Sequence, residues 1–333
     1  MRALTHSIAA AILVVAPASA DTERATDRLA LPVPELSLFA KTPNFGEGLV
    51  FDTDGRLFVS DAFNNMLLVI DREGTVAEWS DEVRLPNGHK ILRDGTHIVM
   101  EGGATDDADA PGGIVHLDFN GELIRRITES AEGVKLRWPN DVAIDLRNGG
   151  FYFTDPGRFM GNEPGRIFHV SPDFAVRLVI DGGLDFPNGI VLSPDGEVLY
   201  VAESLQNRIL VFDITAPGEL SPPRVFAEMP SVPNHWLGGE AEPDGIALDT
   251  DGRLYVAHFG AGLVRVFSPE GELLGSYASG SGTVTNLAFD PVTRSDLYVY
   301  AATGLSFDEI GRGGELIRLR LEGASGVRLA PEE

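Results

Sequence analysis

Short apolar runs alternate with polar turns along the chain, and the alternation itself repeats. Each copy has a short apolar run, a turn that contains Gly or Asn, and a second apolar run rich in Val, Tyr and Phe, which together predict a β-hairpin. The copies recur roughly every 40 to 56 residues, a spacing typical of propeller blades. They begin at Gly46, Pro86, Pro139, Pro187, Pro243 and, in a degenerate form, Val284.

Further strand-like runs follow the hairpins, for example "LLVID", "IVHLD" and "ILVFD", so each repeat has room for about four strands. No long segment has helical periodicity. One blade cannot bury both of its faces alone, so six copies must stack on one another. The pattern therefore predicts an all-β fold, a six-bladed β-propeller with four-stranded blades around a central tunnel, as a single domain over residues 21–333.

Two strand-like runs lie outside the six hairpins, "LSLFA" near Leu36 and "ELIRLRLE" near Leu316. The chain has no Cys, so hydrogen bonding must close the ring. An open blade edge would also promote aggregation. We therefore expect the two runs to share one blade.

The first 20 residues have one Arg, an apolar run too short to span a bilayer, and an Ala-x-Ala ending. This layout is typical of a secretory signal peptide with cleavage after Ala20, which predicts a periplasmic or secreted protein. The alternative is an N-terminal membrane anchor. No later apolar run is long enough to span a membrane.

The chain is strongly acidic, with 26 Lys and Arg against 50 Asp and Glu and a formal charge of −24. Cleavage after Ala20 would remove Arg2 and no acid, which lowers the charge further. Such a charge argues against nucleic acid and anionic membranes as partners and leaves a small molecule as the expected one. Much of the charge can also serve solubility alone. The sequence does not indicate an oligomeric state.

Each complete repeat carries two polar tags with different expected roles. The tag between the two apolar runs is a hairpin turn, because Asp, Asn and Gly tolerate positive φ or bond their own backbone. The tag before the innermost strand has a polar residue of varying kind, and equivalent positions in a propeller converge on the central axis. We expect one polar ring at the tunnel mouth, formed by Glu47, Asn87, Asn140, Asn188, Asp244 and Thr285.

Two carboxylates, three amides and a hydroxyl form an oxygen-rich set without a thiolate. Hard oxygen donors suit Ca²⁺ or Mg²⁺, and a ring of six blades favours the larger Ca²⁺. Ca²⁺ is therefore the expected ion, with Mg²⁺, Zn²⁺ or Mn²⁺ as alternatives. The competing interpretation is that the tags are turns at the start of each inner strand, with their amides bonded to local backbone.

The stretches "PNDVAIDLRNGGFYFTDPG", "FPNGIVLSPDGEVLYVAES" and "PDGIALDTDGRLYVAHFGAG" resemble the senescence-marker-protein/gluconolactonase/luciferin-regenerating-enzyme family. The resemblance runs from about Phe45 to Leu321. It implies a six-bladed propeller with a catalytic divalent cation, commonly calcium, in the tunnel. The metal ligands that it implies are Glu47, Asn140, Asn188 and Asp244, and the carboxylate of Asp244 also has the implied catalytic role.

Other residues are candidates for the substrate pocket. An Arg that some family members place just before the third-repeat Asn is not reproduced here, because Trp138 lies two positions before Asn140. This difference argues against the sugar-acid specificity of those members. The pocket candidates, several of which are equally compatible with turn or loop roles, are Asn87, Trp138, Asp155, His235, Trp236 and His258.

These features together predict an exported, metal-dependent lactonase that opens a neutral lactone to a hydroxy acid. Two alternatives stay open. One is a metal-dependent phosphotriesterase or fluorophosphatase in which Asp244 attacks directly. The other is a non-catalytic binding propeller whose calcium is structural.

Overall fold

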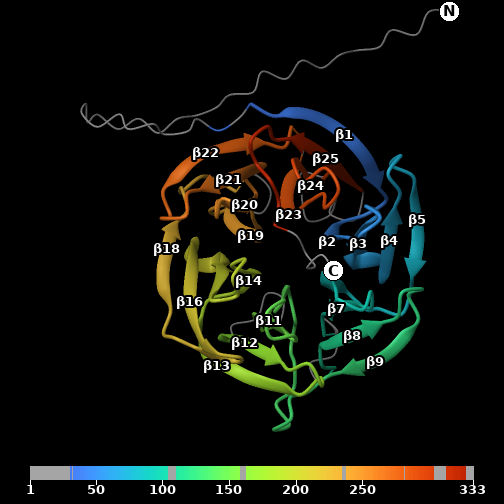
Figure 1. The fold of residues 1–333 in the computed structure, drawn as a ribbon, viewed down its shortest axis with the longest axis vertical. Helices are drawn as coiled ribbons and strands as arrows, with labels where there is room; N and C mark the ends of the chain where they lie inside the picture. The colour runs from blue at the N-terminus through green and yellow to red at the C-terminus, as the bar shows by residue number, and fades with distance from the viewer. Residues whose placement is uncertain are drawn as a thin grey trace, which may run out of the picture.

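The computed structural model of the chain describes residues 31, 33–103, 110–157, 163–234, 238–280, 282–303 and 313–327. Six antiparallel sheets are arranged radially around a central axis, which confirms the predicted six-bladed β-propeller (Figure 1). The predicted signal peptide and its cleavage site lie outside the described residues. Within the described part of the chain, no helix is long and apolar enough to cross a membrane.

The first three blades follow one plan, in which the strands run in chain order from the axis outward. Blade 1 is β2 (Gly46–Phe51), β3 (Leu57–Asp61), β4 (Met66–Ile70) and β5 (Val76–Ser80). Blade 2 is β6 (Pro86–Ile91), β7 (His97–Glu101), β8 (Gly113–Leu117) and β9 (Leu123–Ile127). Blade 3 is β10 (Val142–Ile144), β11 (Phe151–Asp155), β12 (Gly165–Val170) and β13 (Val176–Leu184).

Blade 5 follows the same plan, and blades 4 and 6 vary it. Blade 4 is β14 (Pro187–Leu192), β15 (Val198–Glu203) and β16 (Arg208–Ala216), and both the short β17 (Glu219–Leu220) and β18 (Arg224–Glu228) pair with β16. Blade 5 is β19 (Glu242–Leu248), β20 (Leu254–Phe259), β21 (Leu263–Phe267) and β22 (Leu273–Ala278). Blade 6 is β23 (Thr283–Phe289), β24 (Asp296–Ala302), β25 (Gly314–Arg320) and β1 (Glu35–Thr42). Two 3₁₀ turns, η1 (Ala62–Asn64) and η2 (Ser204–Gln206), follow β3 and β15.

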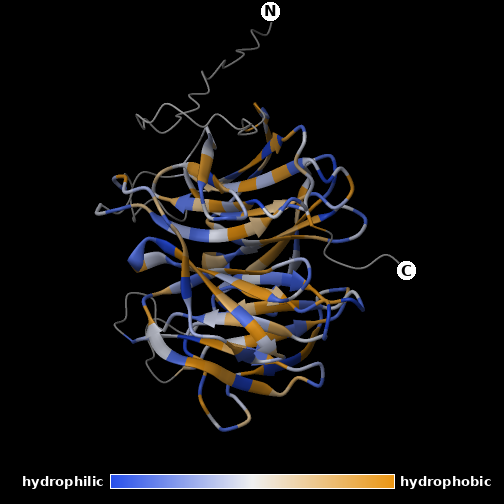
Figure 2. Cartoon of the chain, turned by 60° about the vertical axis from the view of Figure 1, so that its left-hand side comes forward, coloured by the Kyte–Doolittle hydropathy of each residue, from blue (hydrophilic) through white to orange (hydrophobic). Residues whose placement is uncertain are grey.

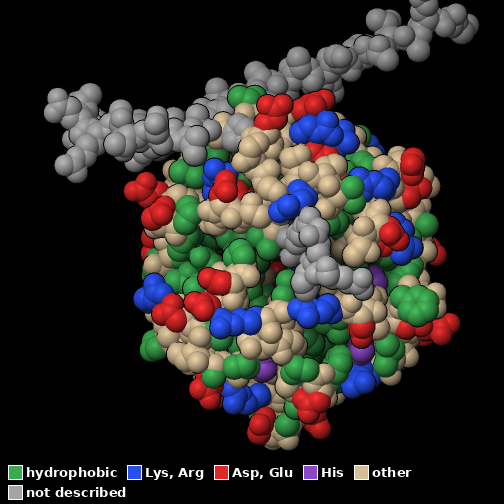
Figure 3. Space-filling view, viewed as in Figure 1, with side chains coloured by type: hydrophobic (Ala, Val, Ile, Leu, Met, Phe, Trp, Pro, Cys, Tyr) green, Lys and Arg blue, Asp and Glu red, His purple; other side chains and the backbone are tan. Residues whose placement is uncertain are grey.

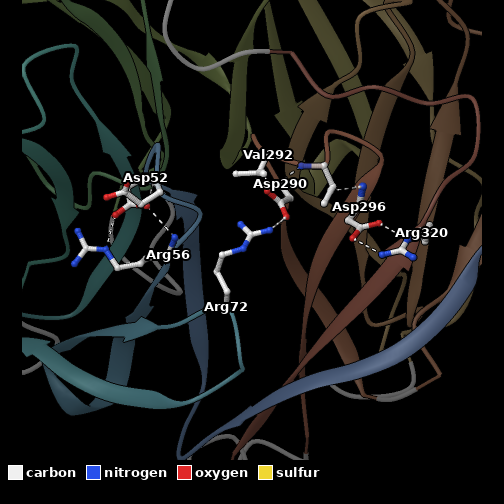
Figure 4. Close-up of polar contacts among 9 residues, drawn as sticks. Asp52, Arg56, Arg72, Asp290, Val292, Asp296 and Arg320 are labelled. Atoms are coloured by element: carbon white, nitrogen blue, oxygen red, sulfur yellow. Dashed lines mark hydrogen bonds and ion pairs between the residues drawn. The ribbon is translucent and has the colours of Figure 1, made fainter.

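The two ends of the chain close the ring, as predicted. β1 pairs antiparallel with β25, with Glu35 opposite Arg320 and Thr42 opposite Gly314. An ion pair also joins blade 1 to blade 6, because Arg72 Nη2 lies 3.2 Å from Asp290 Oδ2 (Figure 4). Hydrogen bonds and ion pairs therefore close the ring without a disulfide.

The second tag of each complete repeat lies in a hairpin turn, which confirms that prediction. Gly55 and Gly252 have φ of 79° and 77° between the first and second strands of blades 1 and 5. An Asp at the start of the turn accepts the backbone N–H of the tag residue, at 3.0 Å for Asp54 N and 2.9 Å for Asp251 N. Asp251 therefore belongs to a turn and lies far along the strand from Asp244.

The hydrophobic core lies between neighbouring blades. Apolar and polar residues alternate along many strands, so each sheet packs apolar side chains against the next (Figure 2). Phe51 and Leu57 of blade 1, for example, pack with Tyr298 and Tyr300 of blade 6. This stacking holds the six inner strands, and hence the tunnel mouth, in fixed positions.

Candidate functional site

A bulge near the start of the inner strand places the ring residue in most blades. In blade 1 the register with β3 shifts between Glu47 and Val50, and blade 5 has the same shift between Pro243 and Ile246. Blades 2 and 4 have it at the corresponding points. A bulge bends the strand and changes the direction of its side chains. The Pro-Asn-Gly and Pro-Asp-Gly tags are therefore the points where the strands leave the regular ladder.

The residue after each ring position is a Gly in four blades, because the next blade lies against it. A Cβ on Gly48 would lie 2.0 Å from the carbonyl oxygen of Asn87. A Cβ on Gly189 would lie 2.2 Å from the carbonyl oxygen of Asp244. The backbones of neighbouring blades thus meet directly at this level, which brings ring positions distant in sequence close together.

Side-chain and backbone hydrogen bonds fix the ring. The Thr154 hydroxyl donates to the carbonyl of Asn188 at 2.8 Å, and the backbone N–H of Asn140 donates to the carbonyl of Thr154 at 2.8 Å. The Thr285 hydroxyl donates to the carbonyl of Gly46 at 2.8 Å. Thr285 thus links blade 6 to blade 1.

The two predicted ring acids, Glu47 and Asp244, are both buried and close enough to interact. Burial raises the pKa of Glu47 well above its usual value, and the charges of Asp244 and Asp141 raise it further. Burial also raises the pKa of Asp244 well above its usual value, with a further increase from Asp141, while a hydrogen bond from the Asn188 side chain opposes the rise. The ring therefore brings buried acids together, and their charges repel one another.

Asp141 is a third acid of the ring that sequence reasoning missed. It is buried directly after Asn140, and burial raises its pKa. Its Oδ1 accepts the N–H of Val142 at 2.8 Å, and its Oδ2 accepts the N–H of Ile190 at 3.2 Å. The available signal was the tag "PND", in which an acid replaces the Gly of the other Pro-Asn tags.

Blade 6 has the matching exception. Asn286 occupies the position that is Gly in blades 1, 2, 4 and 5, and its Nδ2 lies 3.5 Å from Glu47 Oε2. Asn286 Oδ1 accepts the backbone N–H of the next residue, Leu287, at 2.9 Å, just as Asp141 Oδ1 accepts that of Val142. Asp141 and Asn286 therefore add two polar side chains from blades 3 and 6 to the predicted set.

The amide oxygens suit a hard cation. Asn140 Oδ1 is buried and has no hydrogen-bond partner within the described structure, an expensive state for a polar atom. The described residues contain no cluster of three or more His, Cys, Asp and Glu side chains that could hold a metal ion. A divalent ion here would instead need carboxylate and amide oxygens together, which is the donor set that Ca²⁺ accepts. Glu47, Asn140, Asn188 and Asp244 fit such an ion.

Asp155 supports the loop that leads to the third-blade ring residue. Its carboxylate accepts the backbone N–H of Arg137 at 3.0 Å and that of Trp138 at 2.9 Å. It also pairs with the buried guanidinium of Arg166 at 2.5 Å. Glu101 holds the equivalent loop of blade 2 by accepting Arg84 N at 3.0 Å. These bonds occupy Asp155 within the protein and fix the backbone around Trp138.

Large apolar residues stand two positions before the ring residue in blades 1 to 4, and all four are half-buried. Two of them have left-handed backbones, with φ of 42° at Leu85 and 58° at Phe186, a conformation that is strained for bulky residues. A Cβ on Gly102 would lie 2.9 Å from the indole of Trp138, so this ring packs over the loop of blade 2. We name these residues the apolar collar: Phe45, Leu85, Trp138 and Phe186.

The remaining predicted residues are distributed differently. Asn87 is half-buried in the ring. His258 is fully buried on β20 opposite Pro243, and its Nδ1 accepts Arg265 Nε at 3.1 Å. Burial and the Arg265 charge lower the pKa of His258 to about 4, so it is neutral at pH 7. His235 and Trp236 lie outside the described residues.

The face seen along the axis has acidic and basic side chains interspersed around its rim (Figure 3). No extended surface of one sign covers this view. The concentrated charge belongs to the buried ring.

Comparisons with known proteins agree with this architecture. The lactonase drp35 of Staphylococcus haemolyticus (strain JCSC1435) is 31% identical over 231 residues, which are 69% of this chain and 68% of that protein. The lactonase drp35 of Staphylococcus aureus (strain USA300) is 33% identical over the same shares. A gluconolactonase structure from Xanthomonas campestris is 25% identical with a TM-score of 0.70, covering 88% of this chain and 91% of that one.

A structure of the calcium-binding protein regucalcin from Agrobacterium tumefaciens has a TM-score of 0.66 at 20% identity, over 87% of this chain and 98% of that one, a likeness of fold alone. The family profile described as the SMP-30/Gluconolactonase/LRE-like region matches residues 45–303, a span that contains the inner strands of all six blades. The chain therefore belongs to the SMP-30/gluconolactonase/LRE-like family.

Proposed function

We propose that this protein is a divalent-metal-dependent lactonase that hydrolyses a lactone to a hydroxy acid. The observation that carries the proposal is the buried ring itself, in which acids with raised pKa values surround an amide oxygen without a partner. Relatives at 31% and 33% identity are named lactonases, which supports the same reaction class. We also propose export through residues 1–20, so that the enzyme acts in the periplasm or outside the cell.

Glu47, Asn140, Asn188 and Asp244 would hold the ion, for which Ca²⁺ is our proposed identity. Such an ion supplies Lewis acidity toward the lactone carbonyl and its attacking water. Ca²⁺ takes about six to eight oxygen ligands, so an ion held by these four residues would keep positions for water and substrate.

Asp244 has the properties of the general base. Asp244 is buried, and the Asn188 side chain donates a hydrogen bond to its carboxylate, which holds that carboxylate in the ring where water on the proposed ion would lie. Asp244 would take a proton as the water oxygen bonds to the carbonyl carbon. When the ring C–O bond breaks, the same proton passes to the leaving alkoxide oxygen. The product is a hydroxy acid, whose carboxylate the acidic protein repels.

The test is hydrolysis by the purified protein of a panel of aldonolactones, alkyl-substituted lactones, aryl esters and a phosphotriester, each with and without chelator. We expect lactone opening that chelator abolishes and Ca²⁺ restores. If only the phosphotriester is hydrolysed, and isotope from labelled water appears on Asp244, the protein would be a phosphotriesterase and not a lactonase. Ca²⁺ binding without turnover of any compound would make the propeller a binding platform.

A further inference from the structure

Directly beyond the ring, the six inner strands line a cavity of about 180 Å³. Each strand contributes a residue three positions after its ring residue, and strand pairing confirms that these residues are equivalent. Five of the six are small and apolar, and the sixth is a lysine. They are Val50, Lys90, Ala143, Val191, Ala247 and Ala288, all of which line the cavity.

Lys90 is half-buried among these small neighbours. One other basic residue lines the cavity as described, Arg147, and it is paired at the surface with Glu197 at 3.0 Å. Five small side chains leave space for one long one, so the cavity accommodates the lysine stem. Of the two basic residues that line the cavity within the described part of the chain, Lys90 is the one on an inner strand, three positions after a ring residue.

The charge of Lys90 reaches the ring. Its strand β6 lies against Asp141, because Gly88 N donates to the carbonyl of Asn140 at 2.6 Å and a Cβ on Gly88 would lie 2.7 Å from Asp141 Oδ1. Lys90 follows two residues later on the same strand. Asp141 in turn repels both Glu47 and Asp244. The three ring carboxylates exceed the charge of one divalent ion by one, and the ammonium offsets that excess, while the half-buried Glu242 adds a further negative charge near Asp244.

We propose that Lys90 is the built-in counter-charge of the acidic ring and that it sets the affinity and charge preference of the site for metal ions. This inference rests on the divalent ion of the proposed function. A fixed ammonium in a region of low dielectric repels an incoming cation, and it does so more strongly for a trivalent ion. Lys90 therefore weakens binding, keeps it reversible and disfavours trivalent ions.

The test measures ion binding by titration calorimetry in wild type and Lys90→Met, with Ca²⁺ and Tb³⁺ as probes. Lys90→Met should bind Ca²⁺ about tenfold more tightly, or more. The logarithm of the increase in binding affinity should be about 1.5 times as large for Tb³⁺ as for Ca²⁺, because Coulomb energy scales with the charge of the ion. Lys90→Arg, which keeps the positive charge, should bind both ions with nearly wild-type affinity.

Lys41→Met is the matched control, because it removes one lysine from the exposed side of β1, where Lys41 pairs with Glu315 at 2.9 Å. It makes the same change in net charge and should leave both affinities near wild type. If Lys90→Met does not fold, as judged by circular dichroism, Lys90→Gln takes its place. Unchanged affinities, equal gains for the two ions, or no ion binding by any variant would overturn the inference.

The outcomes separate this inference from the proposed function. Turnover of a lactone with unchanged ion affinity in Lys90→Met would overturn the role of Lys90 and leave the lactonase intact. If Lys90→Met binds both ions more tightly, with the larger gain for Tb³⁺, and the protein opens no lactone, the role of Lys90 would be supported and the lactonase function rejected.

Discussion

Asp244 and Asp251 illustrate how two Asp-Gly pairs, seven residues apart, take unrelated roles. Asp244 is buried in the ring beside Asn188 and near Asp141. Asp251 is in an exposed turn, where it pairs with Arg253 at 3.2 Å with over half of its side chain exposed. The difference arises because one pair lies at the bulge within the inner strand β19 and the other connects β19 to the next strand.

The pair Asp244→Asn and Asp251→Asn tests this difference. Asp244→Asn should lower kcat at saturating metal at least 100-fold, because an amide cannot accept the proton of the attacking water. Asp251→Asn should keep activity and metal content near wild type and change the free energy of unfolding by less than about 1 kcal/mol, since it loses only a surface ion pair. Steady-state kinetics and metal analysis on both variants provide the measurement. Equal, full activity of the two in excess Ca²⁺ would reject Asp244 as the base.

At the residue scale, the repeat indicated one register of ring positions and missed the third acid. Glu47, Asn140, Asn188 and Asp244 occupy one register of the repeat, so their convergence follows from the fold. Asp141 stands one position later, where other blades have Gly, and an acid there is also a common turn residue. Only the contacts of Asp141 with Val142 and Ile190 place its charge in the ring. The lowered pKa of His258 likewise depends on burial and on Arg265, which the local sequence does not reveal.

At the scale of the element, the start of β2 depends on a close contact with blade 6. A Cβ on Gly46 would lie 2.3 Å from the ring of Tyr300. The Tyr300 hydroxyl also bonds to Thr42 Oγ1 at 2.5 Å, so the ring cannot easily move. Gly46 thus makes room for the tyrosine that joins β1, β24 and β2 directly beside Glu47.

We expect Gly46→Ala to lower the free energy of unfolding by about 2 to 3 kcal/mol through overpacking, and to weaken metal binding because Glu47 moves with β2. Gly113→Ala is the control, because it also begins a strand and a Cβ there meets nothing closer than 3.3 Å. It should cost less than about 1 kcal/mol. Urea unfolding of the two variants decides the matter, and equal losses would show that the Tyr300 contact is not limiting.

A pair of histidines makes the contact of blades 1 and 2 sensitive to acid. His89 Nε2 lies 2.8 Å from His97 Nδ1, and the rings of Trp79 and Phe58 of blade 1 pack against His97. Burial lowers the pKa of His97 to about 4, an effect that nearby Asp52 opposes. The folded protein therefore keeps His97 neutral in a range where the unfolded chain binds a proton.

Stability should therefore fall as pH falls from about 6.5 to about 4. For His97 alone the loss between pH 7 and pH 5 is about 2 kcal/mol. The ring acids have raised pKa values, so they change stability in the opposite direction, but they do so equally in wild type and variant. Urea unfolding of His97→Gln and wild type at both pH values, in chelator, isolates the histidine. A pH dependence that is the same in both proteins would contradict this assignment.

Sequence pattern predicted the hairpins and their turns because these are local features. The pairing of β18 with β16 completes the four strands predicted for each blade, whereas the additional short strand β17, in "PGELSPP", was not predicted. The apolar collar also escaped notice as a set. Each member stands two positions before a ring residue, just outside the repeat, and only the shared blade geometry makes four separate apolar residues one feature.

At the scale of the whole molecule, the ring of blades is joined at three levels between blades 6 and 1. β1 completes blade 6 at the outside, and Arg72 pairs with Asp290 at the turns. At the axis, the Thr285 hydroxyl bonds to the carbonyl of Gly46. A metal ion at the mouth would also link blade 1 to blade 5, because Glu47 comes from the first blade and Asp244 from the fifth.

Glu47→Gln tests that link through the response of stability to calcium. When no ion is bound, Glu47 is repelled by Asp244 and Asp141, so an ion that binds Glu47 and Asp244 stabilises the folded state and not the dispersed ligands of the unfolded chain. The melting temperature of wild type should rise with Ca²⁺ concentration. Glu47→Gln should lose most of this rise, yet lose little calcium-free stability or even gain some, because one of the repelling charges is gone.

Glu78→Gln is the matched control, since Glu78 is exposed on β5 of the same blade. It removes the same charge and should melt with the wild-type calcium response. Melting curves of the three proteins across a calcium titration give the answer, each referred to its own value in chelator. An identical concentration dependence in wild type and Glu47→Gln would remove Glu47 from the site. The ion would then link fewer blades, and ring closure would depend on β1, Arg72 and Thr285 alone.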